Sequence, residues 1–134
     1  MIARHEIQIR VRYQETDAQG RLHHANYLTY FEQGRTELLR AAGFSYREIE
    51  KEGWMLVVHE VTCRYHLGVE FDDVLRLVTT VEEARGARIV NRYEAFHGER
   101  LVAEGRSVVA CINREGRVTR LPPALLLKTD QAEQ

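Results

Sequence analysis

The segment from residue 26 to residue 42 constrains the fold most, because it predicts a helix that is apolar around most of its circumference. Apolar or small residues recur at steps of three and four, the spacing of one helical face: Tyr27, Phe31, Gly34, Leu38 and Ala42. Further apolar residues widen this face: Leu28, Tyr30 and Leu39. We expect Asn26 to be the N-cap and Gly43 to end the helix. Such a helix has to be covered by other structure.

The rest of the chain is predicted to be mostly β-strand. Apolar and polar residues alternate from His5 to Tyr13, which indicates a half-buried strand before the helix. Four strand candidates follow the helix: Trp54 to Tyr65, Asp72 to Ala84, Ala87 to Phe96 and Arg100 to Asn113. Links as short as Arg85-Gly86 and His97-Gly98-Glu99, and a loop containing Gly68, predict an antiparallel meander.

Two short helices and a tail complete the predicted elements. A capping-box pattern at Ser45 to Glu48 predicts a short helix that ends near Gly53. Ala124 to Leu127 are expected to form a brief terminal helix, and residues 129–134 a frayed tail. The fold class is therefore α+β, with residues 1–134 forming one domain in which five antiparallel strands cover a long helix. A lone sheet leaves two edges open, so we expect a homodimer or a homotetramer built as a dimer of dimers.

The composition limits the class of protein. With 134 residues, 44% hydrophobic and 29% charged, the chain has the size and make-up of one globular domain. A net charge of −1 gives no general attraction to nucleic acid or to an anionic membrane. No stretch approaches ~18 apolar residues and no signal-peptide pattern is present, so we expect a cytoplasmic protein. Cys63 and Cys111 lie far apart and are predicted to be reduced thiols within strands.

The densest cluster of functional groups lies between the first strand and the helix, from Tyr13 to Tyr27. This loop leads to the N-terminus of a buried helix, where free N–H groups and the helix dipole can bind an oxyanion. Asp17 could act there as a nucleophile or base. Asp, Thr, Gly and Asn are also the residues that a turn and a helix cap require. The residues alone therefore leave a catalytic carboxylate and an Asx turn as alternatives.

At these residues the sequence resembles the hotdog-fold acyl-CoA thioesterases of the 4-hydroxybenzoyl-CoA thioesterase family. The runs Tyr13-Gln14-Glu15-Thr16-Asp17-Ala18-Gln19-Gly20 and His24-Ala25-Asn26-Tyr27 are similar to that family's aromatic-x-[D/E]-T-D-x-x-G…H-A-x-Y signature. The likeness continues through three further segments and so covers nearly the whole chain: Tyr30 to Leu39, Phe71 to Leu75 and Gly116 to Pro122. It implies a hotdog fold, in which a five-stranded sheet wraps around a long central helix.

The resemblance implies a thioester hydrolase that needs no cofactor, because coenzyme A is part of its substrate. Asp17 matches the catalytic carboxylate, acting as nucleophile or as a base for water. The N–H groups around His24 and Ala25 would polarise the thioester carbonyl, and Gly20 would serve the turn. Candidates for the substrate site around this loop are Tyr13, Gly20, Asn26 and Tyr27, although Asn26 also fits a helix cap and both tyrosines fit core packing.

Further candidates for substrate binding lie on the predicted strands. Coenzyme A carries a 3′-phosphate and a diphosphate, which arginine side chains bind well. Arg85 and Arg88 flank a turn that is similar in place to the family's phosphate-binding segment, with a solvated turn as the alternative, and Arg64 is another candidate. His59 faces either an acyl pocket or a subunit interface.

Nearby residues raise two further questions, whether the helix carries a second catalytic carboxylate and whether the loop holds a metal ion. Glu32 is either a second catalytic carboxylate on the helix or the ion-pair partner of Arg35, three residues on. His23 and His24 raise the question of a metal site. Adjacent residues that enter a helix point in different directions, and no second cluster has ligand spacing, so we expect no metal.

The expected function is therefore hydrolysis of an acyl-CoA thioester to a free acid and coenzyme A. An enoyl-thioester hydratase on the same fold would need a G-D-x-N-P-x-H run, which the sequence lacks. A non-catalytic acyl-CoA binding or sensing module would keep the pocket without turnover, and it is the alternative from another class. The acyl group, and the choice between coenzyme A and an acyl carrier protein, depend on how subunits pack around the pocket.

Overall fold

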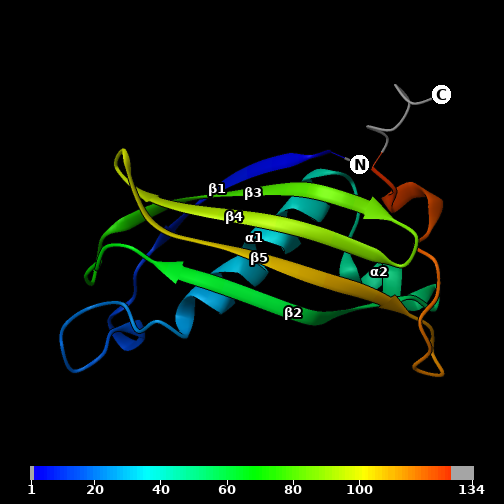
Figure 1. Ribbon diagram of the computed structural model, residues 1–134, viewed down its shortest axis with the longest axis horizontal. Helices are drawn as coiled ribbons and strands as arrows, with labels where there is room; N and C mark the ends of the chain where they lie inside the picture. Colours follow the sequence, from blue (N-terminus) through cyan, green and yellow to red (C-terminus); the bar gives the residue numbers. More distant parts are fainter. Residues whose placement is uncertain (1, 128–134) are drawn as a thin grey trace.

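A five-stranded antiparallel sheet curves around one long helix in the computed structural model of the protein, which describes residues 2–127 (Figure 1). The strands are β1 (Arg4–Arg10), β2 (Met55–Tyr65), β3 (Val74–Arg85), β4 (Arg88–His97) and β5 (Arg100–Ile112). The helical elements are α1 (Asn26–Ala41), α2 (Tyr46–Lys51) and 3-10 turns at Tyr13–Glu15 and Pro123–Leu125. The predicted α+β architecture is confirmed.

The strand order β1-β3-β4-β5-β2 agrees with the predicted strands but not with a meander through the last four of them. β3, β4 and β5 do form a meander, and its two-residue turns hold Gly86 and Gly98 at φ of +60° and +64°. These angles suit the first central position of a type II′ turn, which glycine adopts without strain. β2 pairs with β5 instead of β3, so the predicted meander was wrong for this strand.

The segment between β2 and β3, residues 66–73, is a crossover rather than a hairpin turn. At its start, the His66 N–H donates to Val102 O of β5 over 2.8 Å. At its end, the Asp72 N–H donates to Val11 O, just after β1, over 2.9 Å. The segment therefore spans one end of the sheet and leaves β1 and β2 as its two open edges.

Small residues allow α1 to pack closely on the inner face of the sheet. Phe31 of α1 stacks on Tyr93 of β4, with ring centroids 4.3 Å apart and ring planes 7° from parallel. A side chain on Gly105 of β5 would overlap Phe31, and a methyl group on Gly34 of α1 would overlap the hydroxyl of Thr79. The helix and the sheet therefore meet more closely than two full layers of side chains would allow.

The C-terminal end of α1 and the start of α2 agree with the predictions. Gly43 has a φ of +96°, and the Phe44 N–H donates to Leu39 O over 2.9 Å. This is the long bond of a Schellman motif, so the predicted end at Gly43 is confirmed. Ser45 caps α2, because its hydroxyl accepts the N–H of Glu48 over 3.1 Å.

Two predicted boundaries around the loop before α1 were wrong, and Glu15 explains both. The N-cap of α1 is Ala25 rather than Asn26, because the Asn26 side chain donates to Glu15 O over 2.8 Å. The first strand ends before Tyr13, because the Glu15 carboxylate accepts the N–H of Arg12 over 2.8 Å and draws the chain into a 3-10 turn.

Three other expectations concern the cysteines, the C-terminus and the membrane. Cys63 and Cys111 are free thiols on the neighbouring strands β2 and β5, as predicted. The expected helix at Ala124 to Leu127 is a single 3-10 turn at Pro123–Leu125, and the predicted tail at 129–134 lies outside the described residues. Within residues 2–127, no helix is both long enough and apolar enough to span a bilayer.

Replacing Gly34 with alanine is expected to destabilise the protein, although alanine favours helices. The added methyl group would overlap Thr79 Oγ1 and lie 2.8 Å from Leu77 Cδ2, so the core would have to shift. The free energy of unfolding should fall by about 1–3 kcal/mol. Urea unfolding measures this, with Gln33→Ala at an exposed position of the same helix as the control. An unchanged unfolding midpoint for Gly34→Ala would contradict the close packing.

Candidate active site

The loop between β1 and α1 borders an open cleft of about 300 Å³ at one end of the molecule. In Figure 1 this loop lies at the opposite end of the sheet from the turn between β3 and β4. The other walls come from the first turn of α1, the end of β2 and the crossover. Polar and aromatic lining residues are Asp17, Gln19, Arg21, His24, Tyr27, Tyr65 and His66. The structure thus brings together the predicted site residues Asp17, His24 and Tyr27.

Asp17 uses one of its two carboxylate oxygens to hold the loop. Its Oδ1 accepts the N–H of Gln19 over 2.9 Å and the N–H of Arg21 over 3.3 Å, which forms an Asx turn. Gly20 completes the turn with a φ of +79°, as predicted. No donor from residues 2–127 reaches Oδ2, and the side chain is half-buried. A turn residue and a reactive carboxylate are therefore compatible roles for this one side chain.

The entry to α1 has one backbone N–H group without an acceptor among residues 2–127, and it belongs to a residue that lines the cleft. The Ala25 N–H donates to Nδ1 of His23 over 3.1 Å and is thereby engaged. The His24 N–H has no acceptor in the described part of the chain, while the His24 carbonyl accepts the hydroxyl of Tyr65 over 3.3 Å. Of the two predicted amides, the His24 N–H is the one free to bind an oxyanion at the positive end of the helix.

Aromatic side chains form a wall of the cleft. The His24 ring stacks on His23 with centroids 4.4 Å apart, and its face-to-edge contact with Tyr65 has a centroid distance of 5.9 Å. Tyr27 is buried, and its ring centroid lies 5.6 Å from that of Tyr65. Burial, together with Cys63 and Tyr65 nearby, raises the pKa of Tyr27 to about 12. The Tyr27 hydroxyl therefore stays protonated at neutral pH, where it can donate a hydrogen bond but not act as a base.

A buried carboxylate lies beneath the loop, and sequence reasoning did not single it out. Glu15 Oε1 accepts the hydroxyl of Tyr30 over 2.7 Å and the N–H of Arg12 over 2.8 Å. Burial alone would raise the pKa of Glu15, but these hydrogen bonds and the Arg12 guanidinium hold it below its ordinary value. The three-residue spacing of Arg12 and Glu15 is that of a capping box and could have revealed this contact. No sequence rule links Glu15 to Tyr30.

Three predicted substrate-binding residues of this loop, Tyr13, Gly20 and Asn26, are not among the residues that line the cleft. Tyr13 is 76% exposed, and its ring meets that of Phe71 edge-on at a centroid distance of 5.4 Å. Asn26 is engaged with the Glu15 carbonyl. Tyr13 therefore does not pack in the first strand as expected, and Asn26 acts through the loop rather than at the cleft wall.

Three other predicted residues meet at the opposite end of the sheet. His59, Arg85 and Arg88 line a groove of about 580 Å³ that includes Val108 and Ala110 of β5. His59 lies at a bulge in β2, where the register with β5 shifts. The turn between β3 and β4, which borders this groove, lies at the opposite end of the sheet from the loop between β1 and α1 (Figure 1). The structure therefore does not bring these residues to the Asp17 loop.

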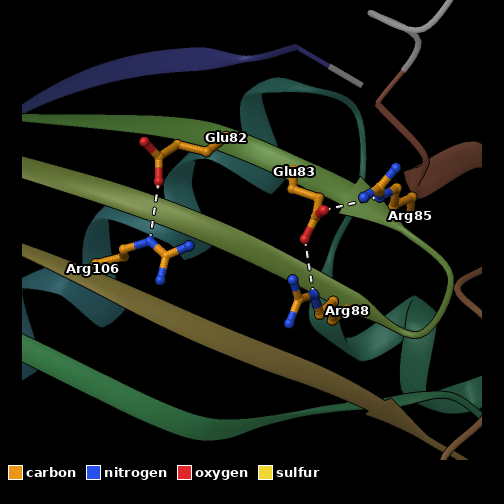
Figure 2. A network of polar contacts seen from close by, with 5 residues as sticks. All are labelled: Glu82, Glu83, Arg85, Arg88 and Arg106. Atoms are coloured by element: carbon orange, nitrogen blue, oxygen red, sulfur yellow. Dashed lines mark hydrogen bonds and ion pairs between the residues drawn. The ribbon is translucent and has the colours of Figure 1, made fainter.

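Glu83 holds both arginines of the turn between β3 and β4, as Figure 2 shows. Its Oε1 accepts the Nε–H of Arg85 over 2.9 Å, and its Oε2 accepts the Nε–H of Arg88 over 2.8 Å. Burial raises the pKa of Glu83, but the hydrogen bonds and charges of the two guanidiniums lower it by more. Both arginine side chains are more than half exposed, so they can still contact an anion. Beside them, Glu82 accepts a hydrogen bond from Arg106 over 3.3 Å.

Arg64 and Glu32 line neither the cleft beside Asp17 nor the groove beside Arg85 and Arg88. Arg64 is exposed on β2, opposite Glu104 in the ladder with β5. Glu32 is 68% exposed on α1, and its Oε2 lies 3.9 Å from Arg35 Nη2, which agrees with the ion-pair reading. In the part of the chain that the structure describes, no three His, Cys, Asp or Glu side chains are grouped as metal ligands.

The fold is that of the hotdog thioesterases, as comparison with known proteins shows. The sequence model of the thioesterase-like superfamily matches residues 11–128, and the chain belongs to that superfamily. The acyl-CoA thioester hydrolase YbgC of Escherichia coli is 32% identical over 126 residues, which cover 93% of this chain and 91% of that protein.

Solved structures extend this similarity. The DHNA-CoA thioesterase of Staphylococcus aureus has a TM-score of 0.85 at 30% identity, over 90% of this chain and 82% of that one. A 4-hydroxybenzoyl-CoA thioesterase variant complexed with 4-hydroxybenzoyl-CoA has a TM-score of 0.82 at 17% identity, over 91% of this chain and 95% of that one. At that identity the likeness concerns the fold alone. The predicted hotdog fold and thioesterase family are confirmed.

Proposed function

We propose that the protein hydrolyses acyl-CoA thioesters to a free carboxylic acid and coenzyme A, with Asp17 as nucleophile or general base. One observation carries the proposal: Asp17 is held through Oδ1, while no donor from residues 2–127 reaches Oδ2. His24, whose N–H has no acceptor in the same residues, lines the same cleft. The names of the acyl-CoA thioester hydrolase and the DHNA-CoA thioesterase support CoA thioesters as the substrate class.

The two roles of Asp17 differ in which bond forms first. As a nucleophile, Oδ2 adds to the thioester carbonyl, the C–S bond breaks with loss of the CoA thiolate, and water hydrolyses the resulting acyl–aspartyl anhydride. As a base, Oδ2 takes a proton from water while the water oxygen adds to the carbonyl, and the proton passes on to the departing thiolate. In both cases the carbonyl oxygen becomes an oxyanion that the His24 N–H stabilises.

Replacing Asp17 with asparagine is expected to lower kcat by roughly 10²-fold or more, because the change removes the anionic oxygen. The amide oxygen of asparagine can still accept the N–H groups of Gln19 and Arg21, so the loop should fold. Turnover is measured with several acyl-CoAs by trapping the released thiol, and circular dichroism reports folding.

The matched control for this experiment is Asp73→Asn. Asp73 also accepts a backbone N–H, that of Glu70 over 2.9 Å, but it does not line the cleft. Its variant should keep turnover. Wild-type rates in a folded Asp17→Asn protein would contradict the proposed role. Saturable binding of acyl-CoA by the wild type without thiol release would instead identify a non-catalytic binding module.

A second copy of the chain is expected to complete the substrate site. The twelve residues of β3 span roughly 40 Å, so the arginine groove of one chain lies far from its own cleft. β2 is an open edge that runs from the groove end to the cleft end, with Val58 and Tyr65 about half exposed. If two β2 edges pair antiparallel about a two-fold axis, the partner's groove end lies beside the first chain's cleft end.

We expect light scattering to give the mass of two or four copies under assay conditions. The reason is that an unpaired β2 edge exposes backbone donors and acceptors as well as apolar side chains. Dilution below the dissociation constant should lower specific activity in step with the loss of the oligomer. A monomer with full activity would refute this assembly.

Arg85 and Arg88 are the proposed contacts for the CoA phosphates. Glu83 orients both guanidiniums through their Nε–H groups and leaves their outer N–H groups for an anion. Arg85→Ala or Arg88→Ala should remove up to about 1.5–3 kcal/mol of binding, less where solvent screens the contact. KM for acyl-CoA should therefore rise several-fold with kcat little changed.

Truncated substrates separate phosphate binding from a structural effect. Acyl-pantetheine lacks the nucleotide, so the wild type and the arginine variants should hydrolyse it equally well. Arg47→Ala, which removes an exposed arginine of α2, serves as the control for lost surface charge. Equal losses on full-length and truncated substrates would assign Arg85 and Arg88 to the fold instead.

A further inference from the structure

Glu15 carries a charge that the fold buries at the base of the Asp17 loop. It is 5% exposed, and among residues 2–127 it is the one buried carboxylate. Its Oε1 accepts the Tyr30 hydroxyl over 2.7 Å and the Arg12 N–H over 2.8 Å, and its Oε2 lies 3.1 Å from the Arg12 guanidinium. Taking a carboxylate out of water is costly, so these partners have to compensate for its burial.

The contacts of Glu15 are those of a group that holds other groups in place. Both carboxylate oxygens are engaged, and Glu15 is not among the residues that line the cleft. It therefore has no free oxygen to offer a substrate, in contrast to Oδ2 of Asp17. Arg12 follows the end of β1 by two residues, and Tyr30 lies in α1, so the two partners flank the loop.

The main chain of Glu15 ties the two ends of the loop together. Its carbonyl accepts the N–H of His23 over 2.9 Å and the side-chain N–H of Asn26 over 2.8 Å. His23 directly precedes His24, and Asp17 follows Glu15 by two residues. A shift of Glu15 would therefore move both proposed reactive groups.

We propose that Glu15 and Tyr30 form a positioning pair that sets Asp17 relative to the His24 N–H. Tyr30 is 1% exposed in the part of α1 that packs against the sheet, so its hydroxyl is a fixed point for the loop. The inference rests on the proposed function, because it assumes the roles given to Asp17 and His24. It adds Glu15 and Tyr30 as positioning residues, which act by holding Asp17 and His24 in place and do not contact the substrate.

A pair of matched variants tests this inference. Tyr30→Phe removes the hydroxyl bonded to Glu15, and Tyr93→Phe removes an equally buried hydroxyl that lies 2.6 Å from Ser107 Oγ, away from the loop. Both should lower Tm by similar amounts. Only Tyr30→Phe should lower kcat, by about tenfold, because misplaced reacting groups slow the chemical step. Its KM for acyl-CoA should stay within about twofold, since the arginine groove is untouched.

A second pair tests rescue by a conservative change. Glu15→Gln keeps an oxygen that can accept both the Tyr30 hydroxyl and the Arg12 N–H, because both bonds in the native protein end on Oε1. It should keep kcat within about threefold of wild type, whereas Glu15→Ala should lose about 10²-fold. If circular dichroism shows that Glu15→Ala does not fold, the comparison of Tyr30→Phe with Tyr93→Phe tests the positioning role.

Equal kcat values for Tyr30→Phe and Tyr93→Phe, whether both unchanged or both reduced, would overturn the inference and make Glu15 and Tyr30 ordinary core residues. So would a folded Glu15→Ala with normal turnover. Failure of the proposed function would show in a different experiment. The wild type would release no thiol from acyl-CoA, or the Asp17→Asn variant would keep its activity. The two results are therefore distinguishable.

Discussion

The structure depends on burying one face of a long helix, which carries Tyr27, Tyr30, Phe31, Gly34, Leu38 and Leu39, against the inner face of a single sheet. The opposite face of α1 is exposed, so the prediction of a helix that is apolar around most of its circumference was wrong. Phe31 lies over Gly105 and Gly34 over Thr79, so the position of α1 along the strands is set by where small residues occur. Once α1 is placed, its N-terminal end is fixed at one end of the sheet. The loop from β1 has to finish there, and the candidate active site follows from where the helix begins.

The periodic parts of this fold were predictable from the sequence. Steps of three and four residues identified α1, alternation identified the strands, and turn chemistry placed the hairpins at Gly86 and Gly98. The pairing of β2 with β5 was not predictable, because residues 66–73 have no local pattern that distinguishes a crossover from a turn. The cap at Asn26 failed for a similar reason, since its competing acceptor, the Glu15 carbonyl, is 11 residues away in the sequence.

The residues of the candidate site also fall into two groups, those that a sequence motif identifies and those that only the tertiary structure brings together. Asp17, Gly20 and His24 belong to one continuous loop, so a motif could identify them together. Tyr65 comes from the far end of β2 and meets His24 only through the fold. His59, Arg85 and Arg88 meet in a groove at the other end of the sheet, where strand length separates them from Asp17. Local patterns predict local chemistry, and tertiary structure decides which local chemistries share a site.

The two open edges of the sheet are unequal, and this bears on how copies of the chain can add to one another. β1 has seven residues and its exposed positions carry polar or charged side chains: Arg4, Glu6, Gln8 and Arg10. β2 has 11 residues. A contact of β2 with β2 closes after two copies, whereas β2 on β1 would leave one free edge of each kind and permit a growing filament. The short, charged β1 edge disfavours the filament. An open β2 edge can therefore pair with a second copy without leading to open-ended aggregation.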